Sequence, residues 1–184
     1  MQKRLDVYLS ENNTVKSRSL AASLIKQGSV EVNGRICTKA SFAVDENDNI
    51  RIIGEMPKYV GRGGLKLEKA LSHYRLHLDG SVCIDIGAST GGFTDCMLQN
   101  GAVKVYSVDV GTDQLDEKLR NDPRVVSMEK TDIRNCVGSL PAVDFIGIDV
   151  SFISLKLVLP SAYALLKDCL LYTSPSPRDA HESR

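Results

Sequence analysis

The chain has 184 residues, of which 42% are hydrophobic, and its 23 basic side chains balance 23 acidic ones. The hydrophobic content is enough for one packed domain or two small ones, and it excludes a disordered or fibrous protein. A formal net charge of zero excludes a chain that coats nucleic acid by bulk attraction, so any such contact has to come from a local cluster of charge.

Two short helices are predicted at the start of the chain. Leu5, Tyr8 and Leu9 recur at helical spacing, which indicates a first helix with one apolar face. Ser17 is a typical helix cap, and the second helix that it begins ends at Gly28. We expect the two helices to form one unit with the strands that follow.

A small sheet is predicted next. Residues 29–36 alternate apolar and polar side chains and turn at Asn33-Gly34, a dipeptide typical of a tight β-hairpin. A further strand at residues 49–53 completes the pattern. Residues 1–56 are therefore predicted to form a small α+β domain, followed by a linker at residues 57–63.

Strands alternate with helices in the second part of the chain. A helix is predicted at residues 65–74, and short apolar strands follow at residues 82–86, 103–108, 124–127 and 143–148. This alternation predicts a parallel, doubly wound α/β sheet of the Rossmann type over residues 64–168.

The last segment, residues 169–184, has no periodicity and carries two Ser-Pro pairs. A doubly wound domain has about five or six strands, whereas only four are counted before this segment. We interpret the segment as the end of a truncated reading frame, which leaves the α/β domain incomplete at its C-terminus. A natural terminus is the alternative.

The strongest chemical motif is at residues 85–94, between an apolar strand and a helix. Its glycines let the backbone turn sharply and approach a ligand closely, and N–H groups at the start of a helix favour an anion. The spacing G-x-x-x-G-G differs from the G-x-G-x-x-G of dinucleotide-binding proteins, and Asp85 stands where a carboxylate can meet an ammonium group. The motif therefore predicts a site for S-adenosylmethionine, with a dinucleotide as the less favoured ligand.

Two further acids follow successive strands. Asp109 comes after the second strand, where an acid accepts hydrogen bonds from ribose hydroxyls, and Asp132 follows the third, where it is placed to meet an adenine amino group. Each acid alone is equally compatible with a capping or turn role, but the three together favour a nucleoside-binding crevice. The predicted cofactor-binding residues are Asp85, Gly87, Ala88, Ser89, Thr90, Gly91, Gly92, Phe93, Asp109 and Asp132.

Several segments resemble a known family. Residues 59–67 (YVGRGGLKL), 85–94 and 149–154 (DVSFIS) are similar to the TlyA or haemolysin A family, whose methyltransferase domain is FtsJ-like. Residues 4–34 resemble the RNA-binding domain of the fourth protein of the small ribosomal subunit. The resemblance implies S-adenosylmethionine-dependent 2′-O-methylation of cytidine in ribosomal RNA, with ribosomal RNA or ribosomal subunits as the partner.

The catalytic set of that family, Lys-Asp-Lys-Glu, is matched in part. Lys66 matches the first lysine and Asp149 the aspartate, whereas the second lysine and the glutamate have no counterpart in this sequence. A desolvated lysine next to a second cation is expected to act as the general base, and Asp149 to orient it. We expect the parent enzyme to be active and this chain to turn over slowly or not at all.

Basic residues near the start of the chain are predicted to contact RNA phosphates, which positions the RNA without reading its sequence. Ordinary surface charge is the alternative, and for Arg62 a turn cap is equally open. For Phe93 and Phe152, core packing is favoured over stacking on a base or on the adenine. The predicted RNA-binding residues are Arg4, Lys16, Arg18, Lys26, Arg35 and Arg62.

The remaining patterns bear on metals and membranes. The five cysteines include no C-x-x-C pair, which speaks against a zinc site. No apolar run reaches the roughly 18 to 20 residues that span a bilayer, and the N-terminus lacks a signal-peptide core. We therefore expect a cytoplasmic methyltransferase with no metal and no membrane partner. The alternative is a non-catalytic RNA-binding protein with a vestigial methyltransferase scaffold, and the two differ in methyl-donor binding.

Overall fold

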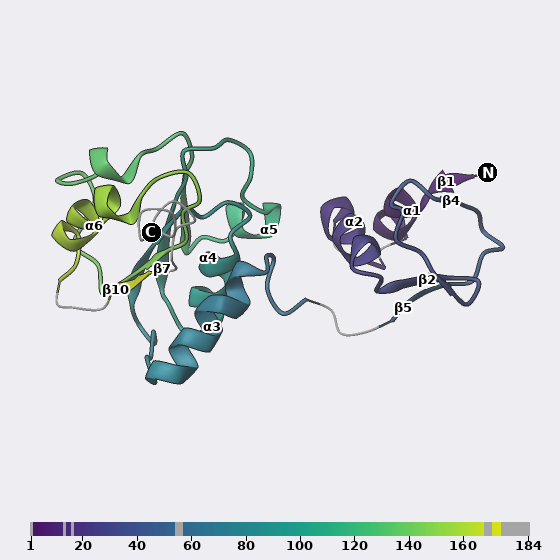
Figure 1. Ribbon diagram of the computed structural model, residues 1–184, viewed down its shortest axis with the longest axis horizontal. Coiled ribbons are helices and arrows are strands. Elements are labelled where there is room, and N and C mark those ends of the chain that lie inside the picture. The colour runs from purple at the N-terminus through teal and green to yellow at the C-terminus, as the bar shows by residue number, and fades with distance from the viewer. Residues whose placement is uncertain (1, 13, 16, 54–56, 168–170, 174–184) are drawn as a thin grey trace, which may run out of the picture. The chain divides into compact units, whose positions relative to one another are not determined.

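The computed structural model describes residues 2–12, 14–15, 17–53, 57–167 and 171–173. The chain divides into two compact units, which are called unit 1 (residues 1–56) and unit 2 (residues 57–184) (Figure 1). In the described residues, no helix is both long enough and apolar enough to cross a membrane.

Unit 1 combines a pair of helices with two small antiparallel sheets. The helices are α1 (Leu5–Glu11) and α2 (Arg18–Lys26). One sheet has the strand order β3-β2-β5, and the other pairs β1 with β4. The strands are β1 (Lys3–Arg4), β2 (Val30–Val32), β3 (Arg35–Ile36), β4 (Ala43–Val44) and β5 (Ile50–Ile52).

Local sequence signals account for most of unit 1. The Leu20 N–H donates to Ser17 Oγ at 3.2 Å, so Ser17 caps α2 as predicted. Asn33 and Gly34 have φ values of 54° and 77°, the left-handed conformation that a two-residue hairpin turn between β2 and β3 requires. The predicted helices and hairpin are confirmed. The β1–β4 pair was not predicted, because strands of two residues carry no periodicity.

Unit 2 is a five-stranded parallel sheet with the order β10-β9-β6-β7-β8. The first strand lies in the middle and later strands are added on both sides, which confirms the predicted doubly wound architecture. The strands are β6 (Val82–Ile86), β7 (Lys104–Val108), β8 (Val125–Met128), β9 (Phe145–Ile148) and β10 (Leu171–Thr173). The helices are α3 (Gly63–Tyr74), α4 (Gly92–Gln99), α5 (Glu117–Arg120), the 3-10 helix η1 (Ile133–Asn135) and α6 (Leu155–Ala164).

Helices cover both faces of this sheet. Figure 1 shows α3 and α4 on one side of the strands and α6 on the other. In β6, Cys83 belongs to the core under α3 and α4, whereas Ile84 and Ile86 belong to the core under α6. Because β6 pairs in parallel with both β7 and β9, the carboxyl ends of these strands meet at one edge. In doubly wound sheets ligands bind at this edge, where the order of the strands reverses.

The four strands counted before residue 169 are confirmed, and the segment that follows adds a fifth strand, β10. It pairs in parallel with β9, with Leu171 opposite Ile146, in the segment that was expected not to form the next strand. A three-residue strand at the edge of a sheet is too short to show a hydrophobic period. Residues 169, 170 and 174–184, the rest of the segment interpreted as a truncated reading frame, lie outside the described residues.

Candidate functional site

The turn between β6 and α4 brings the ends of two strands unusually close. Gly87 has a φ of +83°, and a Cβ atom on it would lie 2.5 Å from the carbonyl oxygen of Asp149. Ser89 also adopts a positive φ of 48°, although it has a side chain, and its N–H donates to Asp109 Oδ2 at 2.7 Å. Such strained residues persist only where the surroundings hold them. The turn is therefore a fixed cradle at the carboxyl edge of the sheet.

Asp85, at the end of β6, is 1% exposed. Its Oδ2 accepts hydrogen bonds from the N–H and the hydroxyl of Thr94, at 2.9 and 2.7 Å, so the carboxylate caps the start of α4. Among the described residues, its other oxygen, Oδ1, is buried without a hydrogen-bond partner. Burial raises the pKa of Asp85 to about 7, although the hydrogen bonds from Thr94 act in the opposite direction. An ammonium group brought to Oδ1 would satisfy this atom and favour the charged carboxylate.

The other two predicted nucleoside-binding acids also hold local backbone. Asp109 accepts from the N–H groups of Ser89 and Gly111, both at 2.7 Å. Asp132 caps η1 and is paired with Arg134, with the shortest contact at 2.6 Å. That hydrogen-bonded pair lowers the pKa of Asp132. The capping role and the predicted position at successive strand ends therefore occur together, and both carboxylates stay partly exposed.

Lys66 and Asp149 meet although they are 83 residues apart in the chain. Lys66 lies in α3, Asp149 directly follows β9, and Lys66 Nζ is 3.0 Å from Asp149 Oδ2. A Cβ atom on Gly63, at the start of α3, would lie 3.7 Å from the same oxygen. The lysine side chain is 56% exposed, so it is not the desolvated group expected from the sequence, and the partner shown is an acid. The pair stands beside the Gly87 turn, because the carbonyl of Asp149 contacts that turn.

The segment before α3 is held on α4 by Asp95, which sequence reasoning missed. Asp95 is 2% exposed and accepts hydrogen bonds from the Val60 N–H, Gln99 Nε2 and Lys118 Nζ at 3.0 to 3.2 Å. Since this segment leads directly into α3, Asp95 fixes the start of the helix that carries Lys66. The available signal was an acid in the first turn of an apolar helix, one residue after the glycine motif.

The sequence also gave no sign of a second pair, Thr94 and Ser107, which holds Asp85 in place. Thr94 Oγ1, which donates to Asp85, lies 2.7 Å from Ser107 Oγ in β7. Thr94 and Ser107 are both buried. Two buried hydroxyls on neighbouring elements therefore set the position of the carboxylate. Thr94 is the last residue of the glycine motif but was not among the predicted site residues.

The two phenylalanines considered from the sequence have opposite environments. Phe93 is 3% exposed and packs in the core under α3 and α4, as expected. Phe152 is 85% exposed, so core packing was wrong for this residue. It follows Asp149 by three positions, in the loop between β9 and α6.

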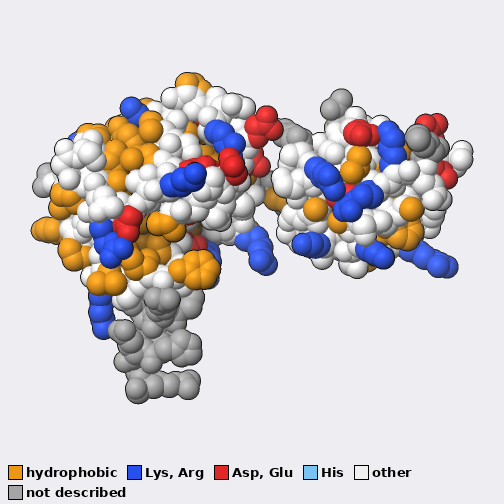
Figure 2. Space-filling view, turned by 90° about the horizontal axis from the view of Figure 1, so that it is seen from above, with side chains coloured by type: hydrophobic (Ala, Val, Ile, Leu, Met, Phe, Trp, Pro, Cys, Tyr) orange, Lys and Arg blue, Asp and Glu red, His pale blue; other side chains and the backbone are white. Residues whose placement is uncertain are grey.

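The predicted RNA-binding residues divide between the two units. Arg4, Arg18, Lys26 and Arg35 are exposed on unit 1, and Figure 2 shows Lys and Arg side chains gathered on the visible face of that unit. Arg62 is exposed in unit 2, immediately before α3. Lys16 lies outside the described residues.

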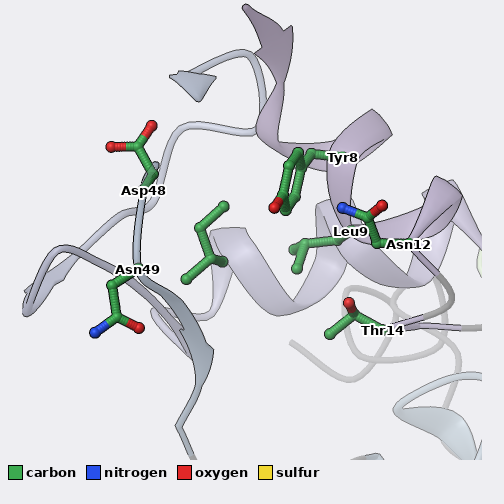
Figure 3. Close-up of a pocket in the computed structure, with 7 residues that line it drawn as sticks. Tyr8, Leu9, Asn12, Thr14, Asp48 and Asn49 are labelled. Atoms are coloured by element: carbon green, nitrogen blue, oxygen red, sulfur yellow. The ribbon is translucent and has the colours of Figure 1, made fainter. Parts of the chain in front are cut away.

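Unit 1 also contains a pocket of about 440 Å³ (Figure 3). Tyr8 and Asn12 of the α1 region line one side of it, and Asp48 and Asn49 line the other. Asp48 accepts hydrogen bonds from Asn33 Nδ2 and the Asp45 N–H, so this wall is held by the hairpin loop. The pocket is a separate feature from the site at Lys66 and Asp149 in unit 2. In the described part of the chain, no group of three or more His, Cys, Asp or Glu side chains is arranged to hold a metal ion.

Comparison with known proteins accounts for both units. The family model described as FtsJ-like methyltransferase matches residues 59–176, and the S4 domain model matches residues 3–50. Solved structures below 25% identity share the fold of unit 2. One example is a structure from Pyrococcus horikoshii that carries the name RNA methyltransferase; it is 19% identical, with a TM-score of 0.50 over 67% of this chain and 66% of that one.

Relatives of much higher identity match both units together. Hemolysin A of Brachyspira hyodysenteriae is 43% identical over 90% of this chain and 70% of its own length. The 16S/23S rRNA (cytidine-2'-O)-methyltransferase TlyA of Mycobacterium tuberculosis is 40% identical over 86% of this chain and 60% of its own. A solved structure that carries the name hemolysin, from Streptococcus thermophilus, is 43% identical with a TM-score of 0.66 over 94% of this chain and 65% of that one.

Unit 2 is thus a Rossmann-like methyltransferase domain, and unit 1 is an S4 domain. The chain belongs to the TlyA or haemolysin A family of FtsJ-like methyltransferases. It spans 60 to 70% of the length of the two curated relatives above.

Proposed function

We propose that the chain binds S-adenosylmethionine at the carboxyl edge of the unit 2 sheet and directs 2′-O-methylation of cytidine in ribosomal RNA, which unit 1 helps to hold. The observation that carries this proposal is the Lys66–Asp149 pair, at 3.0 Å, beside the Gly87 turn. The relatives named as rRNA cytidine-2'-O-methyltransferases supply the substrate class.

The residues present fit the methyl donor. Asp85 Oδ1 is a buried acceptor without a partner among the described residues, which suits the ammonium group of a methionine. Asp109 accepts one backbone N–H on each oxygen, and each carboxylate oxygen has a second acceptor position, which suits ribose hydroxyls. Asp132 is proposed for the adenine amino group, and the backbone of residues 87–93 for the rest of the ligand.

Lys66 and Asp149 are proposed to act on the RNA hydroxyl. When bound, S-adenosylmethionine supplies an electrophilic methyl group on a positively charged sulfur. Asp149 holds the Lys66 amine in one position, and Lys66 holds the ribose 2′-hydroxyl and accepts its proton. Proton acceptance requires the neutral amine, because a lysine ammonium group has three donors and no acceptor.

Phe152 is proposed to hold the target base. Its ring is 85% exposed and lies three positions after Asp149, so a base stacked on it would bring its ribose toward the catalytic pair. Stacking on an aromatic side chain is how single-stranded RNA bases are commonly recognised.

Calorimetric titration of S-adenosylmethionine tests the proposed crevice. We expect the chain to bind, and Asp85→Ala and Asp109→Ala to weaken binding by about tenfold or more, because each removes a charge-assisted hydrogen bond. Asp144→Ala is the matched control, since Asp144 also accepts a backbone N–H, that of Val82 at 2.8 Å, but at the amino end of the strands. Absence of binding by the folded chain, or an equal loss in the control, contradicts the crevice and favours the non-catalytic RNA-binding alternative.

Methyl transfer to purified ribosomal subunits from a tritium-labelled donor tests the catalytic pair. Lys66→Ala is expected to lower the transfer rate by about 100-fold or more, as loss of a general base does, and to leave donor binding within about twofold. Lys69→Ala, an exposed lysine on the same helix, serves as the control. Equal and measurable rates for the two variants would show that Lys66 has no special role, whereas no transfer by the unmodified chain would agree with the missing second lysine and glutamate.

A further inference from the structure

Unit 1 contains a buried carboxylate that is bonded to two arginines. Asp6, in the first turn of α1, is 3% exposed. Its Oδ1 accepts hydrogen bonds from Arg4 Nε at 2.9 Å and from the Val7 N–H at 3.0 Å. Its Oδ2 accepts from Arg4 Nη2 and Arg18 Nε, both at 3.0 Å. These four bonds fill the acceptor capacity of a carboxylate, which has about four lone-pair positions.

Arg4 and Arg18 reach Asp6 from different elements. Arg4 immediately precedes α1, and Arg18 is the first residue of α2. Their hydrogen bonds, with Arg4 contributing most, lower the pKa of Asp6 to about 2 despite its burial. The carboxylate is therefore charged at any physiological pH, and it holds the two guanidinium groups next to each other.

The arginines present their remaining donors to solvent. Their side chains are 51% and 58% exposed. In the described part of the chain, Nη1 of Arg4 and both terminal nitrogens of Arg18 donate no hydrogen bond to the protein. A guanidinium fixed on one edge by a carboxylate loses little further freedom when its other edge binds a phosphate. Two such groups side by side match the oxygens of an RNA backbone.

We propose that Asp6 is a positioning residue that fixes Arg4 and Arg18 as a clamp for the RNA phosphate backbone. The inference rests on the RNA-binding part of the proposed function and adds to it the residue that orders the arginines. If Asp6 acted only through its charge, removing this negative charge from an RNA-binding surface should strengthen RNA binding. A positioning role requires the opposite result.

The RNA affinity of the full chain can be measured by fluorescence anisotropy. Two labelled stem-loop RNAs are used, one from ribosomal RNA and one of unrelated sequence. Asp6→Asn is expected to weaken binding of both RNAs about tenfold, because phosphate contacts carry no sequence information. The slope of log affinity against log salt should become shallower by about 1. Asn keeps one acceptor oxygen but replaces the other with an amide that faces a guanidinium.

Glu11→Gln is the matched control. Glu11 is an exposed acid of the same helix and pairs with Lys3 at 2.7 Å, so its substitution changes the net charge by the same amount without touching the arginines. We expect its RNA affinity to equal or exceed that of the unmodified chain. Asp6→Asn binding as tightly as Glu11→Gln overturns the proposal.

Arg4→Lys and Arg18→Lys keep the inference testable if Asp6→Asn fails to fold, as judged by circular dichroism. Lysine keeps the charge but cannot bond a carboxylate and a phosphate with one planar group. Both variants are expected to bind RNA more weakly by about threefold or more, and unchanged affinity in both overturns the clamp. Failure of the unmodified chain to bind either RNA would instead refute the RNA-binding part of the proposed function, and methyl-donor binding should be unaffected in every variant.

Discussion

Asp6 of unit 1 and Asp85 of unit 2 are both buried, and their carboxylates have opposite surroundings. Asp6 in unit 1 is 3% exposed and Asp85 in unit 2 is 1% exposed. Asp6 is bonded to two guanidinium groups and has its pKa lowered to about 2, whereas Asp85 is bonded only to Thr94 and has its pKa raised to about 7. Burial alone therefore does not decide the charge of an acid, because a neighbouring cation reverses its effect. Unit 1 supplies its own cations, and under the proposed function the ligand supplies the cation for Asp85.

The dependence of stability on pH should differ most between these two aspartates. The unfolded chain ionises Asp85 near pH 3.8 and the folded chain near 7, so this group stabilises the fold below about pH 4 and its contribution is lost as the pH rises through 7. Asparagine does not ionise, so Asp85→Asn should not show this loss of stability. The free energy of unfolding of Asp85→Asn, relative to that of the unmodified chain, should therefore rise between pH 4 and 7 by up to about 4 kcal/mol. Urea unfolding followed by circular dichroism across this range measures the change.

Asp6 should show the reverse dependence in the same experiment. Its lowered pKa gives a stabilising contribution that is present above about pH 4 and lost as the pH falls toward 2. Asp6→Asn should therefore cost roughly 1 to 2 kcal/mol at neutral pH, with a discount because the arginines are half exposed, and little at pH 2. If the unfolding free energies of Asp6→Asn and Asp85→Asn changed with pH in the same direction relative to the unmodified chain, the opposite pKa shifts of the two aspartates would be contradicted.

Gly87 in unit 2 and Gly34 in unit 1 both have a left-handed backbone, but they differ in how closely other atoms pack around them. Gly87→Ala in unit 2 should cost about 3 kcal/mol of unfolding free energy, because it adds the strain of a positive φ to a Cβ contact of 2.5 Å with Asp149. Gly34→Ala in the unit 1 hairpin has a similar φ of +77° but no atom within 4 Å of the added Cβ, so it should cost only about 1 kcal/mol. Equal costs in urea unfolding would mean that the close approach at Gly87 adds nothing.

The affinity for the methyl donor should change with pH through the ionisation of Asp85. An ammonium group binds the ionised carboxylate, so the affinity for S-adenosylmethionine should fall by up to about tenfold per pH unit below about 7 and level off above it. Calorimetry in buffers of different ionisation heat would also detect proton release on binding near pH 6. Asp85→Asn should bind weakly at every pH, and a pH-independent affinity in the unmodified chain would separate Asp85 from the ligand.

The smallest expected effect is that of Phe152→Leu, and it distinguishes stacking on Phe152 from phosphate contacts on unit 1. Phe152→Leu should raise the KM for ribosomal subunits about fivefold through lost stacking, with no change in the salt dependence of RNA binding. Asp6→Asn should change that salt dependence. The fold should tolerate Phe152→Leu, because the ring is 85% exposed. A change of salt slope in Phe152→Leu would assign this ring to the same phosphate contacts as unit 1.

Local sequence was sufficient to predict most of the helices and strands of both units. Ser17 caps α2 and Asn33-Gly34 turns the hairpin as predicted, because caps and turns depend on the conformations available to neighbouring residues. The alternation of apolar strands with helices likewise predicted the doubly wound sheet, since burial on two faces imposes a period on the chain. The strand β10 escaped prediction because it is too short to show that period.

Contacts between distant residues were decided by the tertiary structure. Spacing alone did not reveal that Asp6 joins Arg4 to Arg18, that Asp95 holds the segment before α3, or that Phe152 stays exposed. The meeting of Lys66 with Asp149 was implied only by family resemblance. These contacts depend on the register of the strands and the packing of helices on the sheet. They are set when elements far apart in the chain come together, and it is there that the charge of each buried acid is determined.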